Sequence, residues 1–152
     1  MKESSLNEMT VQFPSLSENE RFARLAVSGF ISSLDPALDE LSEIKTAVSE
    51  AVTNCIVHAY RDTVGIISMQ VRILEGMRVY IRIRDKGCGI PDVAQARTPL
   101  FTTAPDEERA GLGFAIMESF TDRLRVTSRE GKGTTVTMLR TLRTRKPADG
   151  EV

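Results

Sequence analysis

The chain has 152 residues, enough for one domain of ~150 residues and too few for two. Hydrophobic residues make up 41% of the chain and charged residues 27%, a globular composition that excludes an intrinsically disordered protein. Twenty lysines and arginines are balanced by 21 acidic residues, so the net charge of −1 gives no reason to expect nucleic-acid binding.

Targeting signals are also missing from the sequence. No apolar run approaches the ~18 residues of a membrane-spanning helix, and the N-terminal segment lacks a signal-peptide core. The two cysteines, Cys55 and Cys88, make no disulfide framework, so we expect a cytoplasmic protein that does not bind membranes. We expect a single domain over residues 1–143 and a flexible polar tail over residues 144–152.

The N-terminal part of the chain predicts a short strand at residues 9–13 and then a helix. Ser17 and Glu20 have the spacing of a capping box, in which each side chain accepts a hydrogen bond from the other's backbone at the start of a helix. Apolar residues at helical spacing extend this helix to about Leu34. The face expected to be buried consists of Phe22, Leu25, Ala26, Gly29 and Phe30.

A second helix is expected over residues 39–60, after the break at Asp35-Pro36. Because four residues advance a helix by ~400°, Glu50, Asn54 and His58 stack in one row on its surface. His58 is the only histidine and has no catalytic partner in this pattern, so we expect it to pack near a ligand or in the core. The apolar stripe expected in the core is Leu41, Ile44, Val48, Ala51, Cys55 and Ala59.

Two alternating segments predict a hairpin of strands. Apolar and polar residues alternate over residues 67–73 and 77–83, and the tight turn Glu75-Gly76 joins them. Continuing this alternation places Asp85 on the core-facing side, where a carboxylate is costly unless something pairs with it. This inward acid is the first indication of a site.

The remaining chain predicts a long functional loop, a helix and a second hairpin. Residues 86–113 are rich in Gly, Pro and Thr and are too many for a plain connection. A helix is expected at residues 112–120 and strands at residues 124–129 and 134–142. Because helices and strands do not alternate regularly, we predict an α+β fold. It should be a two-layer sandwich with a mixed, mostly antiparallel sheet covered by helices on one face.

Four separated segments carry the chemistry. They are Glu50-Ala-Val-Thr-Asn54, Asp85-Lys-Gly-Cys-Gly-Ile-Pro91, Gly111-Leu112-Gly113-Phe114 and Gly133-Thr134-Thr135. In this order they resemble the N box and the glycine boxes of the GHKL or Bergerat ATP-binding fold, shared by histidine kinases, Hsp90, MutL and type II topoisomerases. The chain resembles more closely the anti-sigma serine kinases of sporulation, the SpoIIAB type, over about residues 9–141. The segments that carry this resemblance are SEAVTNCIVHAY, PLFTTAP and GKGTTV.

The resemblance implies an ATP site whose base end is formed by Asp85. Its carboxylate would accept a hydrogen bond from the adenine amino group, whereas a guanine carbonyl at that place would repel it. Gly87 and Gly89 would let the backbone turn closely beneath the base. Thr134 matches the family residue that reaches the adenine, directly or through water. Taken alone, the Asp85 segment is equally well explained as a turn after a strand, and Thr134 as a residue that opens a strand.

At the phosphate end, the resemblance implies roles for Asn54 and Glu50. Asn54 would bind Mg²⁺ through its amide oxygen, with the metal bridging the ATP phosphates. Glu50, one helical turn earlier, would accept the proton of a substrate hydroxyl as general base, a role worth roughly 10²–10⁴ in rate. Without the motif, both are explained as polar residues on a solvated helix face.

The glycine segment is expected to bind phosphates. Gly111 and Gly113 should precede a helix, where free backbone N–H groups and the helix dipole attract anions, with Leu112 and Phe114 in the same segment. The loop over residues 94–110 would be the ATP lid, in which Arg109 contacts the γ-phosphate or a docked partner. Histidine kinases of the family often carry a third glycine here, which this chain lacks.

The resemblance implies an anti-sigma factor that is also a protein serine kinase. Fewer than 50 residues precede Glu50 and none is histidine, so we do not expect a histidine kinase, nor do we expect the transducer domain of an Hsp90-like protein. A homodimer would inhibit sporulation sigma factor F and phosphorylate an anti-anti-sigma protein on serine with Mg-ATP, without direct contact to nucleic acid. Two alternatives stay open: a stress-response kinase controlling sigma B, and an ATP-gated sequestering module without kinase activity.

Overall fold

Five strands form one sheet in the computed structural model, which describes residues 4–98 and 105–143, the side chains of residues 105–111 excepted. The strands lie in the order β1-β2-β3-β5-β4, and all four pairings between them are antiparallel, which confirms the expected mostly antiparallel sheet. Their bounds are β1 (Asn7–Pro14), β2 (Ile66–Leu74), β3 (Arg78–Arg84), β4 (Arg123–Arg129) and β5 (Gly133–Thr141).

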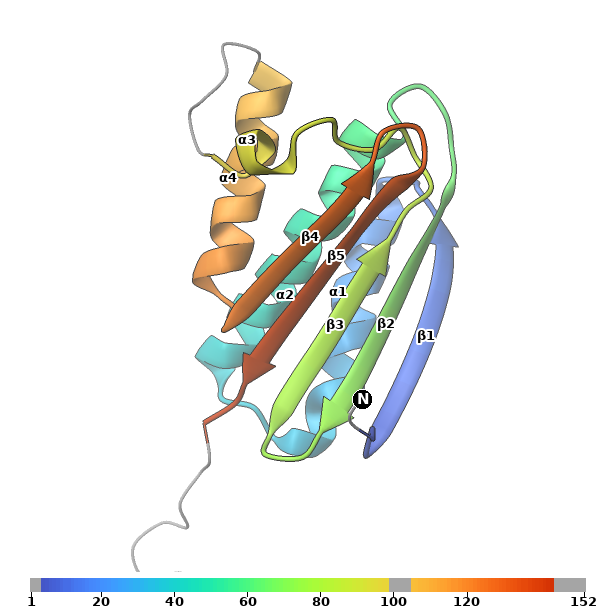
Figure 1. Cartoon of the computed structure of the whole chain (residues 1–152). Helices are drawn as coiled ribbons and strands as arrows, with labels where there is room; N and C mark the ends of the chain where they lie inside the picture. Colours follow the sequence, from blue (N-terminus) through green and yellow to red (C-terminus); the bar gives the residue numbers. More distant parts are fainter. Residues whose placement is uncertain (1–3, 99–104, 144–152) are drawn as a thin grey trace, which may run out of the picture.

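Helices cover one face of this sheet and leave the other open (Figure 1). The α2 helix packs between α1 and α4. The predicted two-layer α+β sandwich is therefore confirmed. The helices are α1 (Glu18–Ile31), which continues into a 3₁₀ turn (Ser32–Leu34), α2 (Leu38–Asn54), which continues into a π-helical turn (Cys55–Ala59), α3 (Val93–Ala96) and α4 (Pro105–Ser119).

The core lies between the sheet and the helices, and it follows the predicted alternation. The buried apolar residues of β2 and β3 that fit this alternation are Ile67, Met69, Val71, Ile73, Val79, Ile81 and Ile83, and Leu74 at the end of β2 is buried outside it. The hairpin turn between these strands contains Gly76 at φ +81°, a conformation that favours glycine. One residue beyond β3, the alternation reaches Asp85, which is buried as predicted.

The first helix differs from the prediction in its cap and in its buried face. Ser17 makes no side-chain capping hydrogen bond, and Glu20 instead pairs with Arg24 and with the Ser49 hydroxyl. The buried face is Ala23, Val27 and Ile31, whereas Phe22 and Leu25 are 45% and 58% exposed. The small and branched side chains let α1 lie close to its neighbours, while the Phe22 ring packs edge-on against the Phe13 ring, with 5.8 Å between ring centroids.

Two helix boundaries also differ from the prediction, both near the expected site. The second helix changes to a π-helical turn after Asn54, a feature that no local sequence signal announces. The last helix begins at Pro105 rather than at residue 112, so Gly111 and Gly113 lie inside α4 and do not precede it. The sequence Pro-Asp-Glu-Glu at 105–108 explains the early start, because proline and acidic residues favour the first turn of a helix.

Candidate functional site

The buried acid predicted from strand alternation lies at the end of β3. Asp85 is 8% exposed, and its backbone N–H still pairs with the Thr134 carbonyl at 3.0 Å. Its Oδ1 atom accepts hydrogen bonds from the backbone N–H groups of Gly87 at 2.9 Å and Thr134 at 3.2 Å. Three protein donors, the third being a thiol, therefore hold this carboxylate in one orientation at the edge of a cavity.

The third donor is Cys55, the first residue of the π-helical turn. Its thiol lies 3.4 Å from Oδ2 of Asp85. Burial, together with the nearby Asp85 carboxylate, raises the pKa of the Cys55 thiol well above its usual value. The thiol therefore stays protonated and donates a hydrogen bond to Asp85. Burial also raises the pKa of Asp85, although the hydrogen bonds from Gly87, Cys55 and Thr134 oppose this shift. Cys55 was expected in the core; it is buried there and also contacts the acid.

The loop after Asp85 lies so close to its neighbours that glycine is required. A Cβ atom on Gly87 would lie 2.3 Å from the Ala59 carbonyl oxygen of the π-helical turn. Gly89 has φ +76°, and its Cβ would lie 2.2 Å from the Arg129 carbonyl oxygen at the end of β4. Between them, the Cys88 N–H donates to the Ala59 carbonyl at 3.1 Å. The loop is thus clamped between α2 and the β4–β5 turn.

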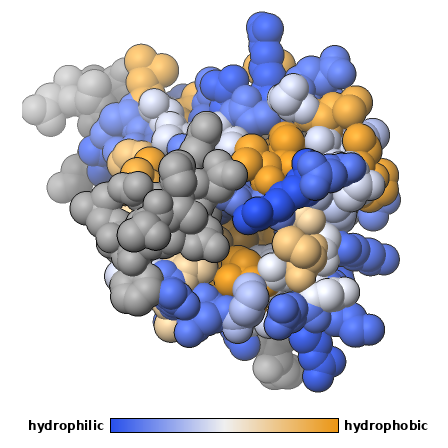
Figure 2. All heavy atoms as spheres, turned by 90° about the horizontal axis from the view of Figure 1, so that it is seen from above, coloured by the Kyte–Doolittle hydropathy of each residue, from blue (hydrophilic) through white to orange (hydrophobic). Residues whose placement is uncertain are grey.

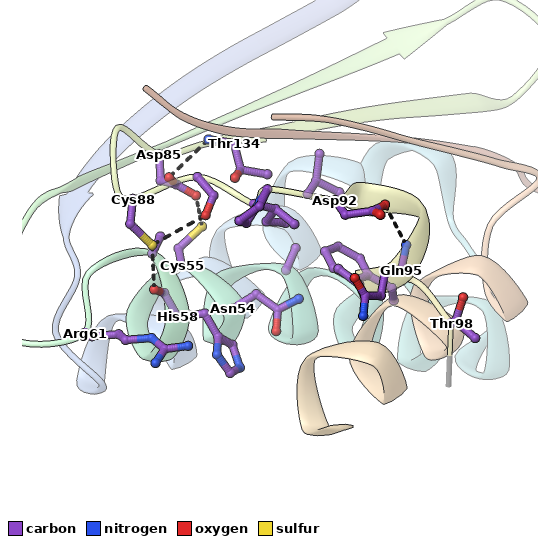
Figure 3. Close-up of a pocket in the computed structure, with 18 residues that line it drawn as sticks. Asn54, Cys55, His58, Arg61, Asp85, Cys88, Asp92, Gln95, Thr98 and Thr134 are labelled. Atoms are coloured by element: carbon purple, nitrogen blue, oxygen red, sulfur yellow. Dashed lines mark hydrogen bonds between the residues drawn. The ribbon is translucent and has the colours of Figure 1, made fainter. Parts of the chain in front are cut away.

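Asp85 and the neighbouring loop form the wall of a cavity of about 250 Å³ (Figure 3). Its lining combines apolar side chains from several elements, among them Ile90, Phe114 and Val136, with polar groups from α2 and β5. In the view onto this end of the molecule, hydrophobic surface is framed by hydrophilic side chains (Figure 2). Apolar walls with a few fixed polar groups are typical of a pocket for a flat organic ligand.

Thr134, the second residue of β5, borders the same cavity and is 9% exposed. Its hydroxyl lies 2.8 Å from the Ser128 hydroxyl, which also accepts a hydrogen bond from the Ile90 N–H at 2.7 Å. Ser128 thereby connects β4, β5 and the glycine loop. No local pattern marks Ser128, because its contacts depend on the pairing of β4 with β5.

Asn54 and Glu50 lie on α2, and of the two only Asn54 lines the cavity. The Asn54 Nδ2 atom is buried and has no hydrogen-bond partner among the described residues. A Cβ atom on Gly113 would lie 3.1 Å from Glu50 Oε2 and 3.5 Å from Asn54 Oδ1, so α4 passes directly over both side chains. An orphaned amide beside a carboxylate is costly in a closed core and points to a ligand at this place.

The remaining predicted residues divide into three groups. Gly89 and Phe114 line the cavity, and Phe114 is buried. Gly87 and Gly113 do not line it but let neighbouring elements approach it, and Leu112 is 43% exposed. Arg109 and Gly111 lie in α4, but the Arg109 side chain lies outside the described part of the structure, as do residues 99–104 of the predicted lid over residues 94–110.

Sequence reasoning missed the residues that the π-helical turn and α3 bring to the cavity. His58 and Arg61 reach it from the turn that follows α2, so His58 lies at the cavity wall. Asp92 lies on the opposite wall, where its Oδ1 atom caps α3 by accepting the Gln95 N–H at 3.0 Å. No pattern within these short segments marks them, since only the tertiary fold brings them to the pocket. The other lining residues that the prediction lacked include Gln95, Ala96 and Thr98.

The residues present fit an adenosine nucleotide. The carboxylate of Asp85 offers a fixed acceptor for an exocyclic amino group, and the apolar walls suit a purine ring. At the other end, the Asn54 amide oxygen is the hard ligand that Mg²⁺ prefers, although the described residues contain no group of three or more His, Cys, Asp or Glu able to hold a metal ion. A magnesium ion here would depend on phosphate oxygens and water for its other ligands.

This α+β sandwich, with its cavity between α2, α4 and the sheet edge, has the architecture of a known ATPase class. The family model for the histidine kinase-like ATPase domain matches residues 13–140. Among solved structures, the RsbU and RsbW domains of Rv1364c from Mycobacterium tuberculosis superpose with a TM-score of 0.66 at 18% identity, over 90% of this chain and 32% of that one. The histidine kinase domain of the Erythrobacter litoralis EL346 blue-light activated kinase gives 0.53 at 22% identity, over 78% and 59%. These two likenesses concern the fold.

Relatives with higher sequence identity indicate which group of this ATPase family the chain belongs to. The anti-sigma F factor of Geobacillus kaustophilus is 56% identical over 86% of this chain and 89% of its own length. The anti-sigma F factor of Pasteuria penetrans is 51% identical over 90% and 91%. The chain therefore belongs to the histidine kinase-like ATPase family and, within it, to the anti-sigma F factors, as the sequence motifs predicted. In the described part of the chain, no helix is long and apolar enough to span a membrane.

Proposed function

We propose that this protein is an anti-sigma factor and a protein serine kinase. It binds and inhibits sporulation sigma factor F and uses Mg-ATP to phosphorylate an anti-anti-sigma protein on serine. The observation that carries the proposal is the buried Asp85 carboxylate, which shares one cavity with the unpartnered Asn54 amide. The names of relatives that are 51–56% identical over most of the chain support the anti-sigma role.

The base end of the site selects adenine. Asp85 accepts a hydrogen bond from the adenine amino group, because its oxygens are already oriented by Gly87, Cys55 and Thr134. Guanine presents a carbonyl at that position, and two acceptors repel each other. The Thr134 hydroxyl, held by Ser128, contributes a second polar contact to the base. The Gly87–Gly89 backbone passes below the ring.

The phosphate end is formed by α2 and the glycine segment of α4. Asn54 is the protein ligand of Mg²⁺, which when bound offsets the charge of the phosphates. The segment over residues 111–114 and Arg109 are the proposed contacts to the phosphate chain. Because Gly111 and Gly113 lie inside a helix in this structure, we expect the N-terminal turns of α4 to rearrange when ATP binds.

Glu50 is the proposed general base. It lies one turn before Asn54, and although it does not line the cavity, its Oε2 atom lies beside Gly113, as does the Oδ1 atom of Asn54. In phosphoryl transfer, such a carboxylate orients the attacking hydroxyl and accepts its proton. The hydroxyl oxygen bonds to the γ-phosphorus in line with the β–γ bridging oxygen, whose bond to that phosphorus breaks as ADP leaves. Glu50 therefore serves the serine of the protein substrate, while Asn54 and Asp85 hold the nucleotide.

The proposed assembly is a cytoplasmic homodimer. The dimer binds sigma F while it holds ATP, and the anti-anti-sigma protein displaces sigma and receives the phosphate. A stress-response kinase acting on sigma B would use the same chemistry on another partner. Because the site chemistry is shared, the choice between these partners is tested by binding and not by the geometry of the pocket.

The direct experiment is incubation with γ-labelled ATP, Mg²⁺ and purified anti-anti-sigma proteins of the sporulation and stress-response systems, followed by mapping of the labelled residue. We expect label on one serine of the sporulation protein, and sigma F retained by this chain in the presence of ATP. Binding of sigma F without any label on the substrate would instead identify a sequestering module. Label on the stress-response protein alone would transfer the assignment to sigma B.

A further inference from the structure

The open face of the sheet carries a concentration of arginines. The alternation that buries Val79, Ile81 and Ile83 turns the residues between them to the uncovered side of the sheet. Glu8 on β1 is the only acidic strand residue on this side. We call the surface the basic face, and its arginines are Arg72, Arg78, Arg82, Arg84, Arg123, Arg125 and Arg129.

This concentration is hidden by the balanced composition of the chain. The basic face contains seven of the 20 lysines and arginines of the chain and only one of its 21 acidic residues, Glu8. The rest of the chain then holds 13 basic and 20 acidic residues, a net charge of −7. The basic face itself carries a net charge of +6, from seven arginines and Glu8, so charge is separated between this face and the rest of a chain whose total is −1. Such a separation gives the face a strong local field without a global attraction for polyanions.

Five of these arginines form two rows with short side chains between them. Arg82 and Arg84 of β3 are paired with threonines of β5, at positions 137 and 135. On β4, Arg125 is paired with Thr137 and Thr127 with Thr135, while Arg123 and Arg129 project to the same side opposite Leu139 and Gly133. Because neighbouring strands are ~4.8 Å apart, the rows lie about 10 Å apart, and arginines two residues apart within a row are separated by ~7 Å.

The two rows are free to bind another molecule. None of these five arginines forms a salt bridge with any residue that the structure describes. Arg72, by contrast, is 3.6 Å from Glu8 Oε2 and lies over the Tyr80 ring at 5.3 Å from its centroid. The aromatic ring on this face is therefore already covered. In Figure 1, no helix lies over this side of the sheet.

We propose that the strip formed by Thr135 and Thr137 of β5, between the two arginine rows, binds an acidic protein segment in an extended conformation. An extended peptide presents every second side chain to one side at ~7 Å, which matches the spacing of arginines within a row. Guanidinium groups bind carboxylates through paired hydrogen bonds, while the short threonines leave room for the peptide backbone.

Other occupants fit the face less well. Single-stranded nucleic acid is bound on aromatic platforms, but Tyr80 is covered by Arg72 and the rest of the molecule carries net negative charge. A twofold dimer through this face would place arginines against arginines, since an isologous interface pairs a surface with itself. The basic face is thus a site for a different, acidic protein, and it lies on the side of the sheet opposite the nucleotide cavity.

The test uses the full chain and a fluorescent peptide of alternating glutamate and threonine, followed by anisotropy. We expect this peptide to bind more tightly than a peptide of equal composition whose glutamates are consecutive. The double variant Arg82→Gln/Arg125→Gln should lose roughly two- to fivefold in affinity for each arginine removed. The variant Arg82→Lys/Arg125→Lys should fall between, because it keeps the charge but not the paired hydrogen bonds.

The matched control is Arg21→Gln/Lys45→Gln, which removes two charges from the helix-covered side and should leave the affinity within twofold. Thermal unfolding and ATP binding show that each variant is folded. Equal losses in the two glutamine doubles, or equal binding of both peptides, would overturn the proposal. Tighter binding of a single-stranded oligothymidylate than of the alternating peptide would assign the face to nucleic acid instead.

Discussion

The two ends of the cavity differ in how far the protein alone organises them. At the base end, each oxygen of Asp85 has a protein donor, and the loop after it is clamped on both sides. At the phosphate end, Asn54 Nδ2 has no partner among the described residues, and the glycines lie inside a helix. The fold thus orients the Asp85 carboxylate without a ligand, while we expect the ligand to complete the phosphate end.

The largest effect is expected from Glu50→Gln at the phosphate end. The amide cannot accept the serine proton, so phosphoryl transfer should fall by about 10²–10⁴, while ATP and sigma binding stay unchanged. Single-turnover transfer to the anti-anti-sigma protein measures this. Glu75→Gln, in the exposed β2–β3 turn at the other end of the sheet, is the matched control. Undiminished transfer in the Glu50 variant would remove Glu50 from the mechanism.

The next effect is expected from Asp85→Asn at the base end. ATP affinity should fall about 10- to 100-fold, because a charge-assisted hydrogen bond to the base is lost and the amide can turn a donor toward it. The variant should remain folded, since the asparagine oxygen still accepts from the Gly87 and Thr134 N–H groups. Calorimetry with ATP is the measurement, with Asp62→Asn as control, and an unchanged affinity would contradict the adenine assignment.

Alanine substitutions at Gly87 and Gly113, one at each end of the cavity, should change the free energy of unfolding in opposite directions. In Gly87→Ala, the new Cβ meets the Ala59 carbonyl oxygen at 2.3 Å, and we expect unfolding free energy to fall by about 1–3 kcal/mol or more. In Gly113→Ala, the new Cβ lies 3.1 Å from Oε2 at the flexible end of the Glu50 side chain, which can move aside. The gain in helix propensity of up to ~1 kcal/mol should therefore outweigh the cost of this contact, and the variant should be more stable.

The same displacement of Glu50 should lower phosphoryl transfer in Gly113→Ala. Urea unfolding together with transfer assays therefore yields opposite signs for stability and activity in this variant. If Gly113→Ala were destabilised as much as Gly87→Ala, the close approach of α4 to Glu50 would be rigid, and the contrast between the two ends would be lost.

The smallest effect is a pH dependence that sharpens the description of the base end. Burial raises the pKa of Asp85, so between its unfolded value of ~3.9 and its native value the native state holds more protons than the unfolded state. The unfolding free energy should therefore fall as pH rises through this window. ATP affinity should change in the opposite direction, because the carboxylate is the acceptor and protonation removes it.

The measurement is urea unfolding across acidic pH for the parent chain and Asp85→Asn, with the difference between the two isolating Asp85. ATP affinity is followed over the same range. A difference curve that rises with pH would show that the native carboxylate is stabilised and not destabilised by its surroundings.

Much of the fold follows from local patterns, and the exceptions have a common origin. The alternation in β2 and β3 placed Asp85 inward without knowledge of the fold. The buried face of α1 was predicted only in part: Ala26 and Phe30 pack against the core, whereas Phe22 and Leu25 are exposed. Both sides of this helix carry apolar residues, so the choice between them depends on the neighbouring elements. The start of α4 was misplaced because its glycines were read as a boundary, although the preceding residues favour a helix.

The site divides in the same way. Asn54, Asp85, Gly89, Phe114 and Thr134 were named from motifs, and the structure brings them to one cavity. The Cys55 thiol on Asp85 and the Ser128 link to Thr134 were beyond reach, because each depends on contacts between segments distant in the chain.

The sequence by itself determined the elements, the inward acid and the family, since these depend on periodicity and on short motifs within single segments. Tertiary structure alone decided that α4 covers Glu50 and Asn54, that a π-helical turn supplies a donor to Asp85, and that arginines of β3 and β4 flank a row of threonines. The physical reason is that strand order and helix packing bring together residues that are far apart in the chain. Their separation in the sequence does not predict their distance in space.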